Sequence, residues 1–125
     1  VLSQYNLPGT FAPTASWRLL KAFMDGAEKA PDLSAQLHVG TILSSDMFYN
    51  ADDTATDRWS RMGVLGVEME SAALYSIAAY AGVDALGVFT VSDNLYTGAQ
   101  TTPEERQNAF TEMMELALPL ADVTV

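Results

Sequence analysis

Cysteine is absent from the 125-residue sequence, and histidine occurs once, as His38. The absence of cysteine excludes disulfide bonds and thiolate metal sites, and it agrees with a reducing compartment. A single histidine also excludes a histidine-rich metal site. Because His38 lies in an apolar stretch, we expect it to be a structural residue of a strand or of the core. We therefore expect no metal site.

Basic residues are scarce as well, since 6 Lys and Arg stand against 16 Asp and Glu and give a net charge of -10. Nucleic acids and anionic membrane surfaces both need cations on the protein, so we expect neither as a partner. No apolar run is long enough to span a membrane, and the start "VLSQYNLPG" lacks the basic region of a signal peptide. A cytoplasmic protein is the expectation that follows.

No repeat or low-complexity linker divides the chain, so we expect a single domain over residues 1–125. Apolar periodicity and capping residues predict helices over 12–30, 56–62, 71–82 and 102–121. Short apolar runs predict strands over 35–45, 64–68 and 84–93. Apolar strands that alternate with helices indicate an α/β fold with a largely parallel sheet covered on both faces.

A polar cluster follows each predicted strand: "SSDMFY", "EMES" and "SDN". Binding crevices of parallel sheets lie beyond the carboxyl ends of the strands. We therefore expect the three clusters at one edge of the sheet.

Glu68 and Glu70 interrupt the otherwise apolar run "GVEMESAALY". A carboxylate in such a place is unfavourable unless it is paired. One interpretation is structural, because free N–H groups and the positive end of a helix dipole attract a carboxylate. The other is a carboxylate that accepts hydrogen bonds from the vicinal hydroxyls of a sugar, with Met69 as an apolar contact. Two residues this close on one segment are poorly placed to flank a bond as glycosidase carboxylates do.

Asp93 and Arg106 each allow two interpretations. Asp93 either turns the chain into the following loop or acts as a general acid in a partly apolar pocket. Arg106 lies in the first turn of a predicted helix, where a cation needs a partner. That partner is either Glu104 or Glu105 in a surface ion pair, or Asp93 across the crevice.

Phe48 and Tyr49 form an aromatic pair after the first predicted strand. Core packing is one interpretation of such a pair. A flat heterocycle that stacks on the rings or meets their edges is the other.

Together, "DMFY", "GVEMESAALY", "TVSDN" and "QTTPEERQNAF" resemble the C-terminal half of the hexameric, bacterial-type purine nucleoside phosphorylases, over nearly all of residues 11–121. "EMES" is shared with the wider nucleoside phosphorylase and nucleosidase superfamily, whereas "SD" followed by "TTPEERQNAF" is more specific to the purine branch. The resemblance implies a three-layer αβα fold with a mixed, largely parallel sheet. We expect that fold to be incomplete here, because the family's N-terminal half has no counterpart in the sequence.

The resemblance also implies roles for the matching residues. Glu70 would hydrogen-bond the 2′ and 3′ hydroxyls of the ribose, with Met69 against the sugar and Glu68 in support. Asp93 would protonate purine N7 as the glycosidic bond breaks, and Arg106 would promote that proton transfer. The remaining positions would line the base site: Phe48, Tyr49, Val67 and Ser92.

The implied reaction is phosphorolysis of a purine nucleoside to the free base and (deoxy)ribose 1-phosphate. The resemblance implies phosphate as co-substrate, no cofactor, and a homo-oligomer that is a trimer of dimers in the family. A hydrolytic nucleosidase and a non-catalytic purine nucleoside-binding protein remain as alternatives. The family's phosphate motifs belong to the half that is missing here, so we expect the chain alone to lack a phosphate site.

Overall fold

The computed structural model describes residues 2–30, 36–47, 52 and 54–123. The chain forms two compact units. The first unit comprises Val1–Thr14 and Leu37–Ala85, and the second comprises Ala15–Gln36 and Leu86–Val125. The prediction of a single domain stays a prediction.

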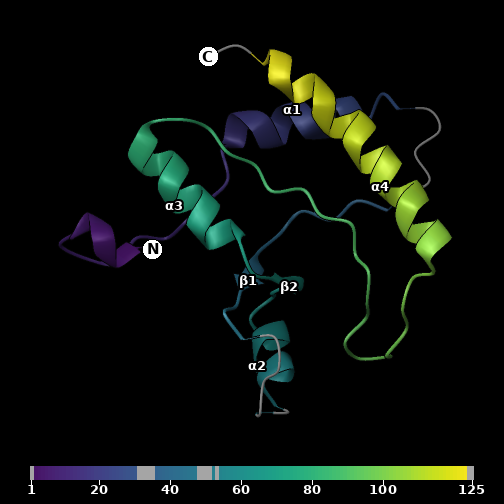
Figure 1. The fold of residues 1–125 in the computed structure, drawn as a ribbon, viewed down its shortest axis with the longest axis horizontal. Helices are drawn as coiled ribbons and strands as arrows, with labels where there is room; N and C mark the ends of the chain where they lie inside the picture. The colour runs from purple at the N-terminus through teal and green to yellow at the C-terminus, as the bar shows by residue number, and fades with distance from the viewer. Residues whose placement is uncertain (1, 31–35, 48–51, 53, 124–125) are drawn as a thin grey trace. The chain divides into compact units, whose positions relative to one another are not determined.

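The first unit contains a short parallel sheet. Its elements in chain order are η1 (Leu2–Tyr5), β1 (Ile42–Ser44), α2 (Ala55–Arg61), β2 (Gly66–Glu68) and α3 (Ser71–Ala81) (Figure 1). β1 and β2 run parallel, with Leu43 opposite Val67 and Ser44 opposite Glu68. Because both strands end at the same edge, the polar residues after them meet there, as predicted for two of the three clusters.

Helix α3 begins directly after the "EME" segment and ends where the sequence predicts. Gly82 takes the left-handed conformation with φ of 68°, and the Val83 N–H returns to the carbonyl of Ala78 at 3.0 Å. This pattern closes a helix that ends in glycine. Near that end Tyr80 stacks on Tyr5 of η1, with ring centroids 4.3 Å apart. The helix is therefore fixed at its C-terminal end, and its N-terminal end carries the candidate site.

The second unit is helical where its structure is regular. α1 (Trp17–Ala27) contacts both α4 (Pro103–Ala117) and η2 (Leu118–Asp122). Phe23 and Ala27 lie one turn apart on α1 and are buried. They form the small core of this unit.

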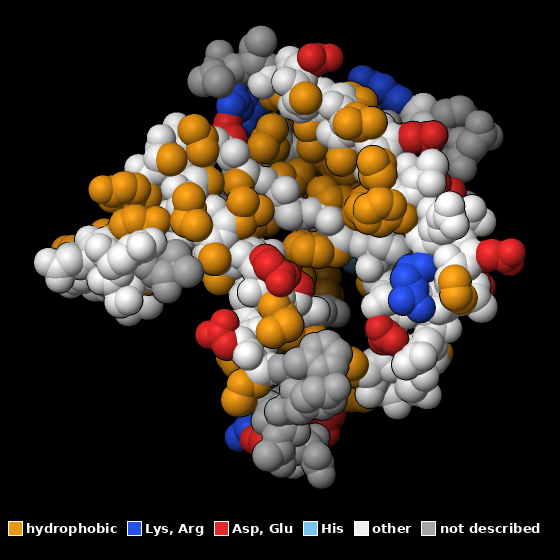
Figure 2. Space-filling model, viewed as in Figure 1, with side chains coloured by type: hydrophobic (Ala, Val, Ile, Leu, Met, Phe, Trp, Pro, Cys, Tyr) orange, Lys and Arg blue, Asp and Glu red, His pale blue; other side chains and the backbone are white. Residues whose placement is uncertain are grey.

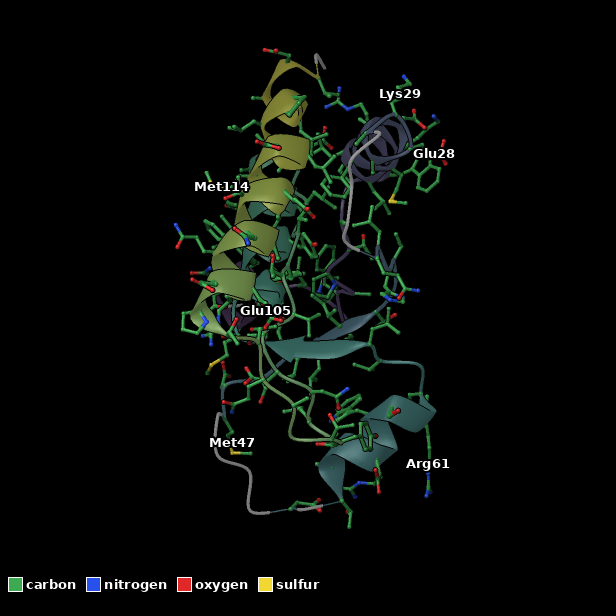
Figure 3. The ribbon with its side chains drawn as sticks, turned by 90° about the vertical axis from the view of Figure 1, so that its right-hand side faces the viewer. Glu28, Lys29, Met47, Arg61, Glu105 and Met114 are labelled. Atoms are coloured by element: carbon green, nitrogen blue, oxygen red, sulfur yellow. The ribbon has the colours of Figure 1, made fainter. Side chains whose placement is uncertain are left out.

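A capping box starts α4 at Thr102, the residue at which the sequence predicts this helix to begin. The Thr102 hydroxyl accepts from the N–H of Glu105 at 3.2 Å, and the Glu105 carboxylate accepts from the N–H of Thr102 at 2.8 Å. Glu105 lies at this end of the helix in Figure 3. The predicted extent to residue 121 is too long, because Pro119 has no N–H to continue an α-helix and the chain passes into η2.

The prediction of a third strand over 84–93 is wrong. Among the described residues only β1 and β2 pair, and Asp93 makes just an isolated antiparallel bridge with Gln100. Apolar composition favours a buried strand, but a ladder also requires a neighbouring backbone to bond with. Phe89 and Val91 are instead 49% and 74% exposed. The first strand is likewise shorter than the predicted 35–45.

Apolar side chains are widely exposed in the described part of the chain, and Figure 2 shows many of them on one face. Leu74, Ile77 and Tyr80 are exposed on α3, and Phe110 and Met114 on α4. Surfaces of this kind are typical of regions that other protein covers. No helix in the described ranges has both the length and the apolar character to cross a membrane.

Candidate functional site

Glu68 is the last residue of β2, and its carboxylate binds the start of α3. The Oε2 atom accepts from the backbone N–H groups of Glu70 and Ser71, each at 2.7 Å. The Oε1 atom accepts from the hydroxyl of Ser44. Glu70 occupies the N-cap position but makes no capping bond with its side chain, so Glu68 supplies the acceptor that a capping residue normally provides. The structural interpretation therefore holds for Glu68.

The surroundings of Glu68 favour its ionised form. Partial burial raises the pKa of the carboxyl, but the hydrogen bonds from the Ser44 hydroxyl and from the N–H groups of Glu70 and Ser71 outweigh burial and lower the pKa below its ordinary value. Glu68 is consequently a fixed anion at the positive end of α3.

Ser44 completes this arrangement, and sequence reasoning missed it. Its hydroxyl donates to Glu68 and accepts from the backbone N–H of Ala72 at 2.9 Å. The parallel register that sets Ser44 opposite Glu68 brings the two side chains together. The sequence signal was the shared sheet edge expected for "SSDMFY" and "EMES", but no role was predicted for Ser44 within the first cluster. We call Ser44, Glu68, Met69 and Glu70 the carboxylate cluster.

Glu70 is exposed, unlike Glu68. Among the described residues its side chain accepts one long hydrogen bond, from the N–H of Met69 at 3.3 Å. Met69 and Val67 flank the glutamates and are 42% and 48% exposed. An exposed carboxylate beside an apolar side chain can accept two hydrogen bonds from a polyol ligand.

Asp93 belongs to the second unit and is exposed. It accepts a hydrogen bond from the hydroxyl of Ser92. The carbonyl of Ser92 in turn accepts from the N–H and the hydroxyl of Thr101, at 2.9 and 3.0 Å. The apolar pocket expected around Asp93 is not formed by the described residues, so its role as a general acid stays a prediction.

The loop after Asp93 folds back on itself. The side chain of Asn94 accepts from the N–H groups of Tyr96 and Thr97 at 2.9 and 3.0 Å, and its backbone N–H donates to Ala99 at 2.8 Å. Gly98 makes the tight return with φ of 69°. The loop thereby brings the segment before α4 alongside Ser92.

Arg106 binds this same segment. Its guanidinium donates to the carbonyl of Thr101 at 3.0 Å. In the described part of the chain it pairs with neither Glu104 nor Glu105, and it makes no ion pair with Asp93. Arg106 is therefore linked to the Asp93 segment through the backbone, which neither sequence interpretation anticipated. We call Ser92, Asp93, Thr101 and Arg106 the acid cluster.

The structure describes one of the three remaining residues that the sequence analysis considered. Phe48 and Tyr49 lie outside the described residues. His38 precedes β1 and is exposed, so the prediction of a strand or core histidine is wrong. The ranges that the structure describes contain no group of three or more His, Asp or Glu side chains suited to hold a metal ion.

The chain matches a family model described as the phosphorylase superfamily, over residues 3–122. It is 53% identical over 112 residues to the DeoD-type purine nucleoside phosphorylase of Alkaliphilus metalliredigens, covering 90% of this chain and 47% of that protein. Identity to the enzyme of the same name from Clostridium novyi is 51% over 113 residues, with the same coverage. Identity to the DeoD-type purine nucleoside phosphorylase of Clostridium beijerinckii is 56% over 110 residues, covering 87% of this chain and 45% of that protein.

The chain thus spans about half the length of the curated relatives it matches. The matched residues include both the carboxylate cluster and the acid cluster. The resemblance carried by the four motifs is confirmed, and with it the expected fold class. Since the match extends over nearly all of the sequence, the chain belongs to the phosphorylase superfamily.

Proposed function

We propose that the protein containing this chain catalyses the phosphorolysis of purine nucleosides. The pentosyl group passes from the purine to phosphate, giving the free base and ribose or deoxyribose 1-phosphate. The observation that carries the proposal is the accessible carboxylate of Glu70, which Glu68 anchors through the backbone. The names of the relatives support the same reaction.

In this proposal Glu70 binds the sugar. Its two oxygens accept hydrogen bonds from the 2′ and 3′ hydroxyls of the ribose, and such charge-assisted bonds are strong. Met69, which is partly exposed beside it, covers an apolar face of the sugar. Glu68 already accepts three hydrogen bonds, so its contribution is to support Glu70.

Asp93 is the proposed general acid. Cleavage of the glycosidic bond leaves negative charge on the purine and an oxocarbenium-like sugar, and protonation of N7 neutralises the leaving group. Arg106 promotes this step by exchanging the Thr101 carbonyl for the Asp93 carboxylate, since both lie on one hydrogen-bonded segment of the second unit. Ser92, Val67, Phe48 and Tyr49 are proposed to line the base site.

Phosphate is the proposed co-substrate, with no metal and no organic cofactor. The protein is proposed to act in the cytoplasm as a homo-oligomer, a trimer of dimers as in the family that its motifs resemble. Nucleic acid is not a proposed partner because the chain has 6 Lys and Arg against 16 Asp and Glu.

The test is release of base from inosine and from adenosine by the full-length protein, with and without phosphate. Release that requires phosphate and yields the sugar 1-phosphate supports the proposal. Release without phosphate indicates the hydrolytic nucleosidase, and binding without turnover indicates the non-catalytic protein. Either of these two results would overturn the proposal.

Asp93→Asn is the accompanying variant, and loss of a general acid is expected to lower kcat by about 100-fold or more. Asp25→Asn is the matched control, because Asp25 lies in the same unit and forms an exposed ion pair with Lys21. That control should retain the wild-type rate.

A further inference from the structure

Ser44 joins three segments of the first unit through one hydroxyl. It ends β1, lies opposite Glu68 at the end of β2, and accepts from the N–H of Ala72 in the first turn of α3 at 2.9 Å. Its side chain is half-buried. The hydroxyl therefore uses both its donor and an acceptor position within the protein.

The hydrogen bond from Ser44 fixes the orientation of the Glu68 carboxylate. With Oε1 held by that hydroxyl, Oε2 faces the backbone N–H groups of Glu70 and Ser71 at 2.7 Å each. The backbone of Glu68 is itself held, because its carbonyl accepts from the N–H of Ser45 at 2.8 Å. The peptide groups on both sides of Glu70 are thus positioned from Ser44.

Glu70 depends on this support because its own side chain makes few hydrogen bonds among the described residues. Its carboxylate is exposed and makes one local bond of 3.3 Å to Met69 among the described residues. The direction in which it points follows from the backbone at residues 69–71. Binding groups held in place by a supporting layer of hydrogen bonds lose less entropy when the ligand binds.

We propose that Ser44 is a positioning residue that sets the sugar-binding carboxylate of Glu70 through Glu68. This inference rests on the proposed function, in which Glu70 binds the ribose hydroxyls. Ser44 itself touches no substrate in this account. Without its hydroxyl, the Ala72 N–H and one oxygen of Glu68 lose their partner, and Glu68 is free to turn away from the Glu70 N–H.

The effect of removing the Ser44 hydroxyl should depend on whether the sugar of the substrate carries its 2′ and 3′ hydroxyls. A nucleoside with both the 2′ and 3′ hydroxyls uses Glu70, whereas its 2′,3′-dideoxy analogue does not. A variant that misplaces Glu70 therefore loses rate on the first substrate and keeps its rate on the second. General damage to the fold would lower both rates together.

The experiment compares Ser44→Ala, Ser44→Thr and Ser76→Ala in the full-length protein. The substrates are inosine or adenosine, whichever reacts faster, and its 2′,3′-dideoxy analogue, both with phosphate. Ser76→Ala is the matched control, because that hydroxyl donates to the Ala72 carbonyl within α3. Ser44→Thr keeps the hydroxyl and should restore the rate.

For Ser44→Ala we expect kcat/KM to fall about tenfold on the ribonucleoside and by less than about twofold on the dideoxy analogue. An equal loss on both substrates, or no loss on either, would overturn the role of Ser44. The proposed function would still stand in that case, provided that the wild-type protein turns over the ribonucleoside. A wild-type protein that neither turns over nor binds the ribonucleoside would overturn both.

Discussion

The Oε2 atom of Glu68 lies 2.7 Å from the backbone nitrogen of Glu70, so the first glutamate of "EMES" anchors the second. Glu68 is held at the start of α3 by three hydrogen bonds, and Glu70 is exposed beside Met69. Two chemically identical side chains two residues apart therefore have different surroundings. One stabilises the local fold, and the other is available to a ligand.

Glu68→Ala should loosen the start of α3. The N–H groups of Glu70 and Ser71 lose their acceptor, as happens when a capping residue is removed, so we expect a loss of about 1–2 kcal/mol in the free energy of unfolding. Hydrogen exchange at these two amides should accelerate at the same time. Glu115→Ala, at an exposed position of α4, is the control. Unchanged exchange in Glu68→Ala would contradict the anchoring role.

The contribution of Glu68 should depend on pH. Folding lowers its pKa below the ordinary value of 4.5, so the ionised carboxylate stabilises the folded state above that pH. The stabilisation is lost as the pH falls through the lower pKa of the folded state. The difference in unfolding free energy between wild type and Glu68→Gln should thus be constant near neutral pH and shrink in acid.

Asp52 and Glu105 also have lowered pKa values, through hydrogen bonds from Thr54 and Thr102, respectively. Both carboxylates are present in wild type and in Glu68→Gln, so their effects cancel in the difference. A difference that stays constant down to strongly acidic pH would contradict the account.

Two glycines should respond to alanine in opposite directions. Gly82 closes α3 with φ of 68°, where a Cβ is strained, so Gly82→Ala should destabilise the protein by about 1 kcal/mol. Gly26 lies within α1, and a Cβ built there meets nothing within 4 Å. Gly26→Ala should therefore stabilise by about 0.5–1 kcal/mol. Thermal unfolding of the two variants measures both changes, and shifts of the same sign would contradict this assignment.

Arg106→Ala should affect catalysis more than binding. If Arg106 promotes proton transfer from Asp93, kcat falls by about 10–100-fold while the KM for the nucleoside changes little. Arg61→Ala, in the last turn of α2, is the control. A rise in KM with an unchanged kcat would indicate a binding role instead.

The sequence predicts α3 and the start of α4 correctly because their signals are local. Gly82 ends α3, and Thr102, Pro103 and Glu105 begin α4 within a few residues of one another. Such signals need no tertiary contact to act. These two helix boundaries are therefore predicted closely, whereas the helix predicted over 12–30 is shorter in the structure, where α1 spans Trp17–Ala27.

The errors have a common physical origin in tertiary context. The third strand fails because pairing needs a neighbour that composition does not reveal. Ser44 was missed because its partner lies 24 residues away and is reached through the register of two strands. The partner of Arg106 is a backbone carbonyl, which no pattern of charged residues indicates.

The most direct test of the account compares wild type with Glu70→Ala in the full-length protein, measuring ribose 1-phosphate formed from a purine ribonucleoside and phosphate. We expect wild type to form it in step with the free base. Glu70→Ala, which removes two charge-assisted hydrogen bonds to the sugar, should lower kcat/KM by about 100-fold or more. Equal rates in the two proteins, or base released without ribose 1-phosphate, would contradict the account.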